Sequence, residues 1–431
     1  MLNDFRQLLR QNRNYRYMWI GQVVSEVGDH FNNIAVFSLA MQTTHSGLVV
    51  SGIMLSRAIP AVMAGPLAGV ILDRFDRKRI MLASDLIRAF VALAFVLTVH
   101  HHQTWLLYGL SALLMGASPF FTSGRTSILP SITSKEELHT ANSLTQTTQW
   151  TTLTIGTMVA GLSAAGLGYQ WAFVLNALSF FASAACIWQL RRAGGFRAKR
   201  EGRAGEQVVR PWREYKEGLL YMGSSPLILA IAVVYVGWAT GGGAAQILFT
   251  LFGEQVFNRG PAGIGIIWSA AGAGLLLGGT LGHSLGRRIS FRNYKRAIVI
   301  CYVLHGGTYM LFSQMRSFTA ALFFIALSRV GMAVCSVLNV SQLLRRVPDG
   351  FRGRVFATID SLTWSIMMLS LAAAGIFSQY HSPRTIGLVA GILSTSPAIY
   401  WGIVNWKGKL PEPETMIIEP EGVEVHSGPA A

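Results

Sequence analysis

Two acidic side chains in the first apolar segment are the residues best suited to chemistry. In WIGQVVSEVGDHFNNIAVF (19–37), Gln22, Glu26, Asp29 and Asn33 recur at spacings of four, three and four residues, so they share one face of a helix. If this helix spans a bilayer, a charged carboxylate at its centre costs about 2.5–3.5 kcal/mol on insertion scales. The face must therefore meet a cavity or a partner, and its acids are candidates to take up and release protons.

Arginines occur within two other apolar segments, where they are equally costly to bury. Arg57 and Arg329 either bind an anionic substrate or neutralise the acids. We expect neutralisation for Arg57, and both roles stay open for Arg329. Permanent ion pairs between these arginines and Glu26 or Asp29 are the alternative to proton coupling, because a permanent pair carries no protons.

The composition predicts that long helices in a membrane position these residues. Of the 431 residues 51% are hydrophobic and only 13% are charged, which is unusual for a soluble chain. Windows of about 20 residues, the length that crosses a hydrocarbon core, predict an all-α integral membrane protein with twelve spans. They lie near 17–41, 48–72, 80–99, 104–128, 140–165, 170–190, 226–251, 261–286, 296–314, 318–344, 354–378 and 384–405.

The distribution of basic residues predicts the orientation. An even number of spans puts both termini on one side, and 30 of the 36 lysines and arginines, Arg125 among them, fall in segments assigned to that side. Cytoplasmic segments carry such an excess. We therefore expect both termini in the cytoplasm. The net charge of +16 is explained by membrane orientation and lipid contact and does not indicate nucleic-acid binding.

A polar segment divides the chain into two halves. The linker contains GGFRAKREGRAGEQ and is followed by the amphipathic stretch PWREYKEGLLYM, which predicts a short helix at the membrane surface. We expect a bundle of six helices at 1–190, a cytoplasmic linker with this helix at 191–216, a second bundle of six at 217–406 and a disordered tail at 407–431.

A loop motif follows the second span, in GPLAGVILDRFDRKR (65–79). The spacing of Gly65 and Gly69 predicts close approach of another helix, and the basic residues Arg74 and Arg77 anchor the span at an anionic leaflet. Asp73 sits where it can pair with a base on a neighbouring helix, as part of a cytoplasmic latch.

The two halves echo each other in sequence. Asn142-Ser143-Leu144-Thr145 corresponds to Asp360-Ser361-Leu362-Thr363 at an offset of 218 residues, as expected for transporters built from repeats. Asp360 is a candidate to complete the latch with Arg74 or Arg77, and a plain charge near a helix N-terminus is the alternative.

These segments resemble the major facilitator superfamily. The stretch 65–79 is similar to the loop signature between its second and third helices, with Asp76 in place of the usual glycine, while LPSITSKEELHTANSL (129–144) and VPDGFRGRVFATIDSL (347–362) resemble its drug-efflux branch, which includes macrolide exporters and the enterobactin exporter. The resemblance implies two pseudo-symmetric six-helix bundles around a central cavity and alternating access. Thr157 replaces a proline of the antiporter motif, which weakens the inference of antiport.

Other function classes lack their signatures. The sequence has no G-x-x-x-x-G-K-[ST] loop, no catalytic triad and no metal-ligand spacing, so we expect neither an enzyme nor a cofactor or metal. A passive channel would lack the paired halves and the latch. The residues predict a monomeric exporter of an amphipathic, drug-like compound in exchange for protons in a bacterial cytoplasmic membrane, and a siderophore or lysophospholipid transporter is the alternative.

Overall fold

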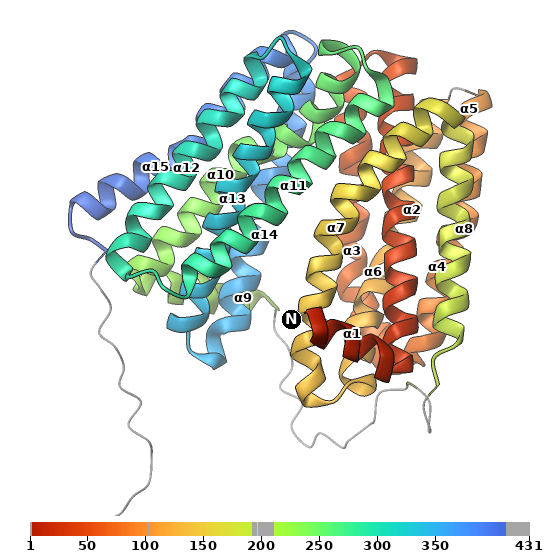
Figure 1. The fold of residues 1–431 in the computed structure, drawn as a ribbon, viewed down its shortest axis with the longest axis horizontal. Helices are drawn as coiled ribbons and strands as arrows, with labels where there is room; N and C mark the ends of the chain where they lie inside the picture. The colour runs from red at the N-terminus through yellow and green to blue at the C-terminus, as the bar shows by residue number, and fades with distance from the viewer. Residues whose placement is uncertain (1, 102, 192–195, 197–210, 411–431) are drawn as a thin grey trace, which may run out of the picture.

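The chain folds into helices throughout the part that the structure describes. A computed structural model describes residues 2–101, 103–191, 196 and 211–410, and within these ranges it contains no β-strand. Figure 1 shows long helices in two groups that lean together at one end of the molecule. The predicted all-α architecture is confirmed.

The first group is formed by the N-terminal half of the chain. Its helices are α1 (Leu2–Gln11), α2 (Arg13–Thr44), α3 (Gly47–Arg74), α4 (Arg77–Ala94), α5 (Val96–His101), α6 (Thr104–Ile132), α7 (Lys135–Leu167) and α8 (Tyr169–Trp188). The short helix α1 was not predicted, because it is too polar for a membrane window, yet it buries Phe5 and Leu8 against the group.

The second group is formed by the C-terminal half. Its elements are α9 (Pro211–Ser224), α10 (Pro226–Leu251), the π-helical turn η1 (Phe252–Val256), α11 (Gly260–Gly286), α12 (Phe291–Gln314), α13 (Phe318–Arg346), α14 (Asp349–Phe377) and α15 (Pro383–Trp406). Helix α9 begins where the amphipathic stretch predicted a helix. It packs on α14 through an ion pair of 3.0 Å between Glu217 and Arg354 and through stacked rings of Tyr221 and Phe351.

The number of apolar spans can be compared with the predicted twelve. Eleven helices in the described ranges are long and apolar enough to cross a membrane. The remaining predicted span, the first one at 17–41, corresponds to α2, which has 32 residues and is therefore excluded by its composition and not by its length. Most of the predicted linker and the tail beyond residue 410 lie outside the described residues.

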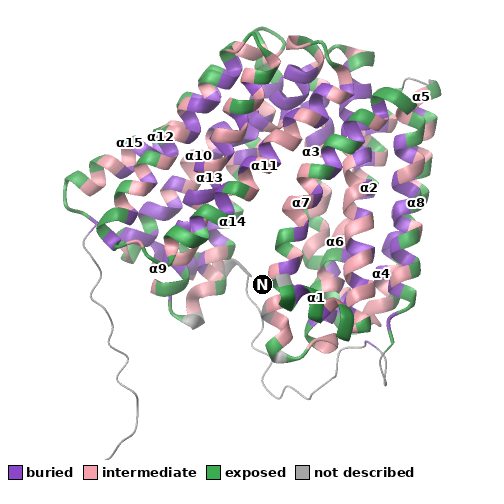
Figure 2. Cartoon of the chain, viewed as in Figure 1, coloured by how far each residue is buried: buried purple, intermediate pink, exposed green. Residues whose placement is uncertain are grey.

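Large apolar side chains cover the outside of both groups. Met63 and Trp406, for example, are 73% and 86% exposed, and Figure 2 shows exposed and half-buried positions along the outer faces of the helices. Such extensive apolar exposure is abnormal for a protein surrounded by water. It is the arrangement that lipid contact requires.

The turn between α3 and α4 explains the aspartate in the loop motif. Asp76 is the N-cap of α4, and its carboxylate accepts a hydrogen bond of 3.0 Å from the backbone N–H of Arg79. The φ angle of Asp76 is −69°, a value that any residue adopts. The turn therefore needs no glycine at this position, and aspartate gains a capping role there.

The two groups touch at one end, which we call the sealed end, and diverge toward the other, the terminal end, where α1 and α9 lie (Figure 1). At the sealed end, small residues bring α7 and α11 together. A Cβ atom added to Gly161 would lie 2.6 Å from the carbonyl oxygen of Pro261 and 2.9 Å from the Cα of Gly265. The backbones of the two groups are thus in direct contact here.

The terminal end lacks this contact between α3 and α14. A Cβ atom added to Gly65, Gly69 or Gly353 would meet no atom within 4 Å. The close helix approach predicted for Gly65 and Gly69 is therefore wrong for this conformation. The half of α3 nearer the terminal end, which carries both glycines, lies apart from the second group. Gly278 and Gly282 of α11, which are also four residues apart, do pack closely, against α13.

Candidate functional site

A cavity of about 450 Å³ lies between the two groups. Helices α2, α3, α6 and α7 line it from the first group, and α10, α11 and α14 line it from the second. Most of the lining is apolar and includes Phe37, Met54, Met115, Trp268, Trp364, Met367 and Met368. Methionine side chains are flexible and polarisable, so a wall rich in them adapts to ligands of different shape.

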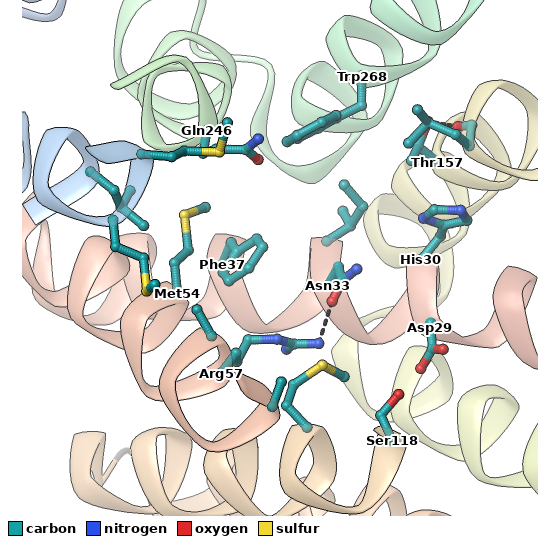
Figure 3. A pocket seen from close by; sticks show the side chains of 18 of the residues that line it. Asp29, His30, Asn33, Phe37, Met54, Arg57, Ser118, Thr157, Gln246 and Trp268 are labelled. Carbon is teal, nitrogen blue, oxygen red and sulfur yellow. Dashed lines mark hydrogen bonds between the residues drawn. The ribbon is translucent and has the colours of Figure 1, made fainter. Parts of the chain in front are cut away.

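Two charged side chains line the cavity, Asp29 on α2 and Arg57 on α3. Figure 3 shows both side chains beside the cavity, with Gln246 and Trp268 facing them from the second group. The shared helical face predicted for the first span is thus partly confirmed, because Asp29 and Asn33 line the cavity together. Glu26, one turn nearer the terminal end, is not part of the lining.

Arg57 is held by amides and not by acids. Its guanidinium donates hydrogen bonds to Asn32 at 3.1 Å and to Asn33, and it lies 5.6 Å from the centre of the Phe37 ring. In the described part of the chain no carboxylate comes within 4.0 Å of Arg57. Arg57 therefore forms no direct ion pair with an acid of α2 in the described residues, and its expected neutralising role stays a prediction, since the neighbouring asparagines satisfy the guanidinium without removing its charge.

Asp29 has no ion-pair partner within 4.0 Å among the described residues, and its buried Oδ1 atom accepts no hydrogen bond there. Leaving a charged oxygen buried without a donor is costly. Binding of a proton, or of a cationic group in the cavity, would remove this cost. Asp29 therefore fits the proton-exchange role better than a permanent ion pair.

Glu26 lies in a different environment although it is only three residues away. Its carboxylate accepts hydrogen bonds from Gln22 at 2.7 Å and from Thr152 at 3.0 Å, and it lies 3.7 Å from the guanidinium of Arg125 on α6. Arg125 was predicted to belong to a segment on the cytoplasmic side, and it lies within α6 instead. Its position inside the apolar run 104–128 was the signal that it lies within the helix group.

Arg329 does not reach the cavity. Its guanidinium lies 5.3 Å from the ring centre of Phe249 and donates to the sulfur of Met332 at 3.3 Å, in the interior of the second group. The prediction of a cavity role for Arg329 is not supported by this arrangement, because α13 turns this side chain toward α10. Asp85 and Arg88, three residues apart on α4, form a buried ion pair.

The loop-motif residues form only part of the predicted latch. Asp73 lies 3.9 Å from Arg77, which also donates to the backbone oxygen of Ser127 at 2.9 Å. Asp360 is exposed, and no ion pair joins it to Arg74 or Arg77 in the ranges that the structure describes. A latch that includes Asp360 stays a prediction for a conformation in which the terminal end is closed.

No group of three or more histidine, cysteine, aspartate or glutamate side chains that could hold a metal ion occurs among the described residues. The site therefore consists of an apolar wall with one free acid, one amide-bound arginine and neighbouring polar groups.

Comparison with known proteins agrees with this fold and cavity. Residues 18–372 match the family model described as Major Facilitator Superfamily, and the chain belongs to this family. The relatives include the MFS-type transporter YfiS of Bacillus subtilis, 28% identical over 93% of this chain and 94% of the relative. Macrolide efflux protein A of Streptococcus pyogenes is 25% identical over 91% of this chain and 96% of its own length.

Solved structures share the fold at low identity. A bacterial homologue of the iron transporter ferroportin in an inward-facing state superimposes with a TM-score of 0.66 at 17% identity, covering 90% of this chain and 98% of that one. The protein is therefore a multi-pass membrane transporter of this family.

Proposed function

We propose that this transporter exports an amphipathic organic compound across the bacterial cytoplasmic membrane in exchange for protons. The observation that carries the proposal is the cavity, where a wall of methionine and aromatic side chains surrounds the unpaired carboxylate of Asp29. The apolar wall suits the apolar part of a substrate, and the carboxylate suits a proton or a cationic group. The similarity to a macrolide efflux protein favours export of a drug-like compound.

The orientation follows from charge. The terminal end, which carries α1 and α9, is cytoplasmic in our proposal, because the basic residues concentrate in the segments on that side. The sealed end then faces outward. In this conformation the compound enters the cavity from the cytoplasm, and rocking of the two groups about the cavity opens the sealed end to release it.

Asp29 is the principal coupling acid in this scheme, and Glu26 assists it. Asp29 faces the cavity with no cationic side chain within 4.0 Å in the described residues, whereas Glu26 is held by Arg125 and by two hydrogen bonds. Protonated Asp29 would release a cationic substrate group, and deprotonated Asp29 would bind one. This competition for a single carboxylate is sufficient to couple the two movements. We propose that the protein works as a monomer in contact with anionic lipids.

The test is the accumulation of a compound panel in efflux-deficient cells that express wild type or Asp29→Asn, with and without a protonophore. The panel contains cationic dyes, macrolides, a catecholate siderophore and a lysolipid. We expect wild type to lower the accumulation of one class, and both the substitution and the protonophore to abolish this effect. The proposal fails if a folded Asp29→Asn variant exports as wild type does.

A substrate with an anionic group, such as a siderophore or lysophospholipid, is the second candidate. Arg57 favours it, since its guanidinium lines the cavity and has no carboxylate within 4.0 Å in the described residues. Arg57→Gln separates the candidates. Export of a cationic dye should survive this substitution, whereas export of an anionic compound should be lost.

A further inference from the structure

Glu254 forms a polar cluster that joins the two groups at the sealed end. It belongs to η1, the π-helical turn that ends α10, and its carboxylate accepts hydrogen bonds from the hydroxyl of Ser38 and from the amide of Gln42 at 3.5 Å, both on α2. The hydroxyl of Tyr169, on α8, lies 2.9 Å from Ser38 Oγ. A chain of donors thus runs from the first group to one acid of the second.

The other contacts across the sealed end involve small or neutral residues. Gly161 of α7 lies against Gly265 of α11, and Gly375 of α14 lies against Ser51 of α3. Among the described contacts between the groups at this end, the one that includes a carboxylate is therefore the contact of Glu254 with α2. Single π-helical turns inside helices occur often at functional sites.

Among the described residues, no cation balances Glu254 within the seal. No lysine, arginine or histidine side chain in the described residues lies within 4.0 Å of its carboxylate. Arg259, which follows η1, instead stacks on Phe318 with its guanidinium carbon 4.5 Å from the ring centre. The groups that face Glu254 from α2 and α8 are neutral, and His45, at the end of α2, is exposed.

We propose that Glu254 is a proton-binding site of the outer seal, separate from the acids that exchange protons in the cavity. When the seal is open, Glu254 is exposed to outer water and ionised. When the seal forms, the carboxylate loses part of its hydration without gaining a cation, which is unfavourable for the charged form. One proton taken from outer water makes the carboxyl neutral, and the carboxyl can then donate its proton to Ser38 Oγ or Gln42 Oε1.

This protonation step determines which conformation acid in the outer water favours. Acid in the outer water favours the sealed conformation, which is the one that receives substrate from the cytoplasm. The proton returns to outer water when the seal opens, so Glu254 adds no proton to the exchange. The inference uses the orientation of the proposed function but not its coupling acids.

The test measures the seal directly, without substrate. Spin labels at Gln103→Cys and Arg316→Cys, two exposed positions on opposite groups at the sealed end, report the outer distance in the full-length protein in nanodiscs. Cys186, Cys301 and Cys335 are replaced by serine. Between about pH 8 and pH 5 we expect the ratio of sealed to open molecules to rise about three- to tenfold, as expected for one half-buried carboxylate.

Two variants assign the response to Glu254. Glu254→Gln carries the neutral isostere, so it should be largely sealed at both pH values and lose most of the response. Gln255→Ala changes the exposed neighbour on the same turn and should respond as wild type does. The inference is overturned if acid opens the seal, or if Glu254→Gln keeps the wild-type response.

A third variant separates this inference from the proposed function. Asp29→Asn in the same labelled protein should lose export while the pH response of the seal remains. If export proves independent of protons but the response still disappears in Glu254→Gln, the proposed coupling is wrong and the outer site stands.

Discussion

The carboxylate of Glu26 lies 3.7 Å from the guanidinium of Arg125, so the first acid of α2 has a basic partner on α6. The side chains are 22% and 12% exposed, an environment between a surface pair and a fully buried one. Asp29, one turn further along α2, has no such partner in the described residues. The two acids therefore lie in different electrostatic surroundings, although helical periodicity places them on one face of α2.

Arg125→Gln should destabilise the protein by about 1–3 kcal/mol, between the values for exposed and fully buried pairs. The substitution leaves Glu26 charged among helices with only neutral donors, and thermal unfolding in detergent measures the loss. The double variant Glu26→Gln/Arg125→Gln should recover part of it, because no unpaired charge remains. Equal losses in the single and double variants would contradict this account.

Asp85→Ala should cause one of the largest losses of stability in the chain. The pair with Arg88 is almost completely buried, with side-chain exposures of 0% for Asp85 and 3% for Arg88, and Ser183 donates to the carboxylate at 2.7 Å. Removing one partner of a buried pair costs about 3–5 kcal/mol. Thermal unfolding of the purified variant in detergent gives the measurement.

Asp73→Ala is the matched control for that experiment. Asp73 also lies near an arginine of its own segment, Arg77, but at 3.9 Å and with 77% of its side chain exposed. Exposed pairs contribute little, so its melting temperature should stay close to wild type. Similar losses in both variants would show that burial does not decide the contribution of these pairs.

The helices were predicted well because the signal for each one lies within its own residues. A run of about 20 apolar residues between polar turns needs no knowledge of its neighbours, and eleven of the twelve predicted spans correspond to helices that pass the length and hydropathy requirement. The face of α2 that carries Asp29 and Asn33 was also predictable, since helical periodicity alone places them together.

Partners across helices were not predictable in the same way. The bonds of Arg57 to asparagines, the pair of Glu26 with Arg125 and the turning of Arg329 away from the cavity depend on the rotation of each helix about its axis. Small differences in packing set that rotation, and one sequence contains no direct record of it. The triple glycine 241–243 shows the same limit, because a run of glycines is compatible both with a helix break and with close packing. Helix α10 runs through it unbroken, and Gly241 and Gly243 pack on α15 and α14.

Gly161→Leu should loosen the sealed end. Its position on α7 is 2.6 Å from a backbone oxygen of α11 once a Cβ is added, so a side chain there must push the groups apart. We expect the outer distance between spin labels at Gln103→Cys and Arg316→Cys to lengthen. Gly166→Leu is the matched control on the same helix, since an added Cβ meets no atom within 4 Å there, and its distance should remain that of wild type. The account fails if the two variants behave alike.

Gly69→Trp should leave this conformation intact and stop transport. An added Cβ at Gly69 meets nothing within 4 Å, so the variant should fold and melt as wild type does. If α3 must approach α14 when the terminal end closes, the indole blocks that approach, and we expect export to be lost. Gly109→Trp on α6, which is exposed and equally free of contacts, should transport normally. Export by Gly69→Trp at the wild-type rate would show that Gly69 does not enter the closed contact, and the latch predicted from the loop motif would then have to be placed elsewhere on α3.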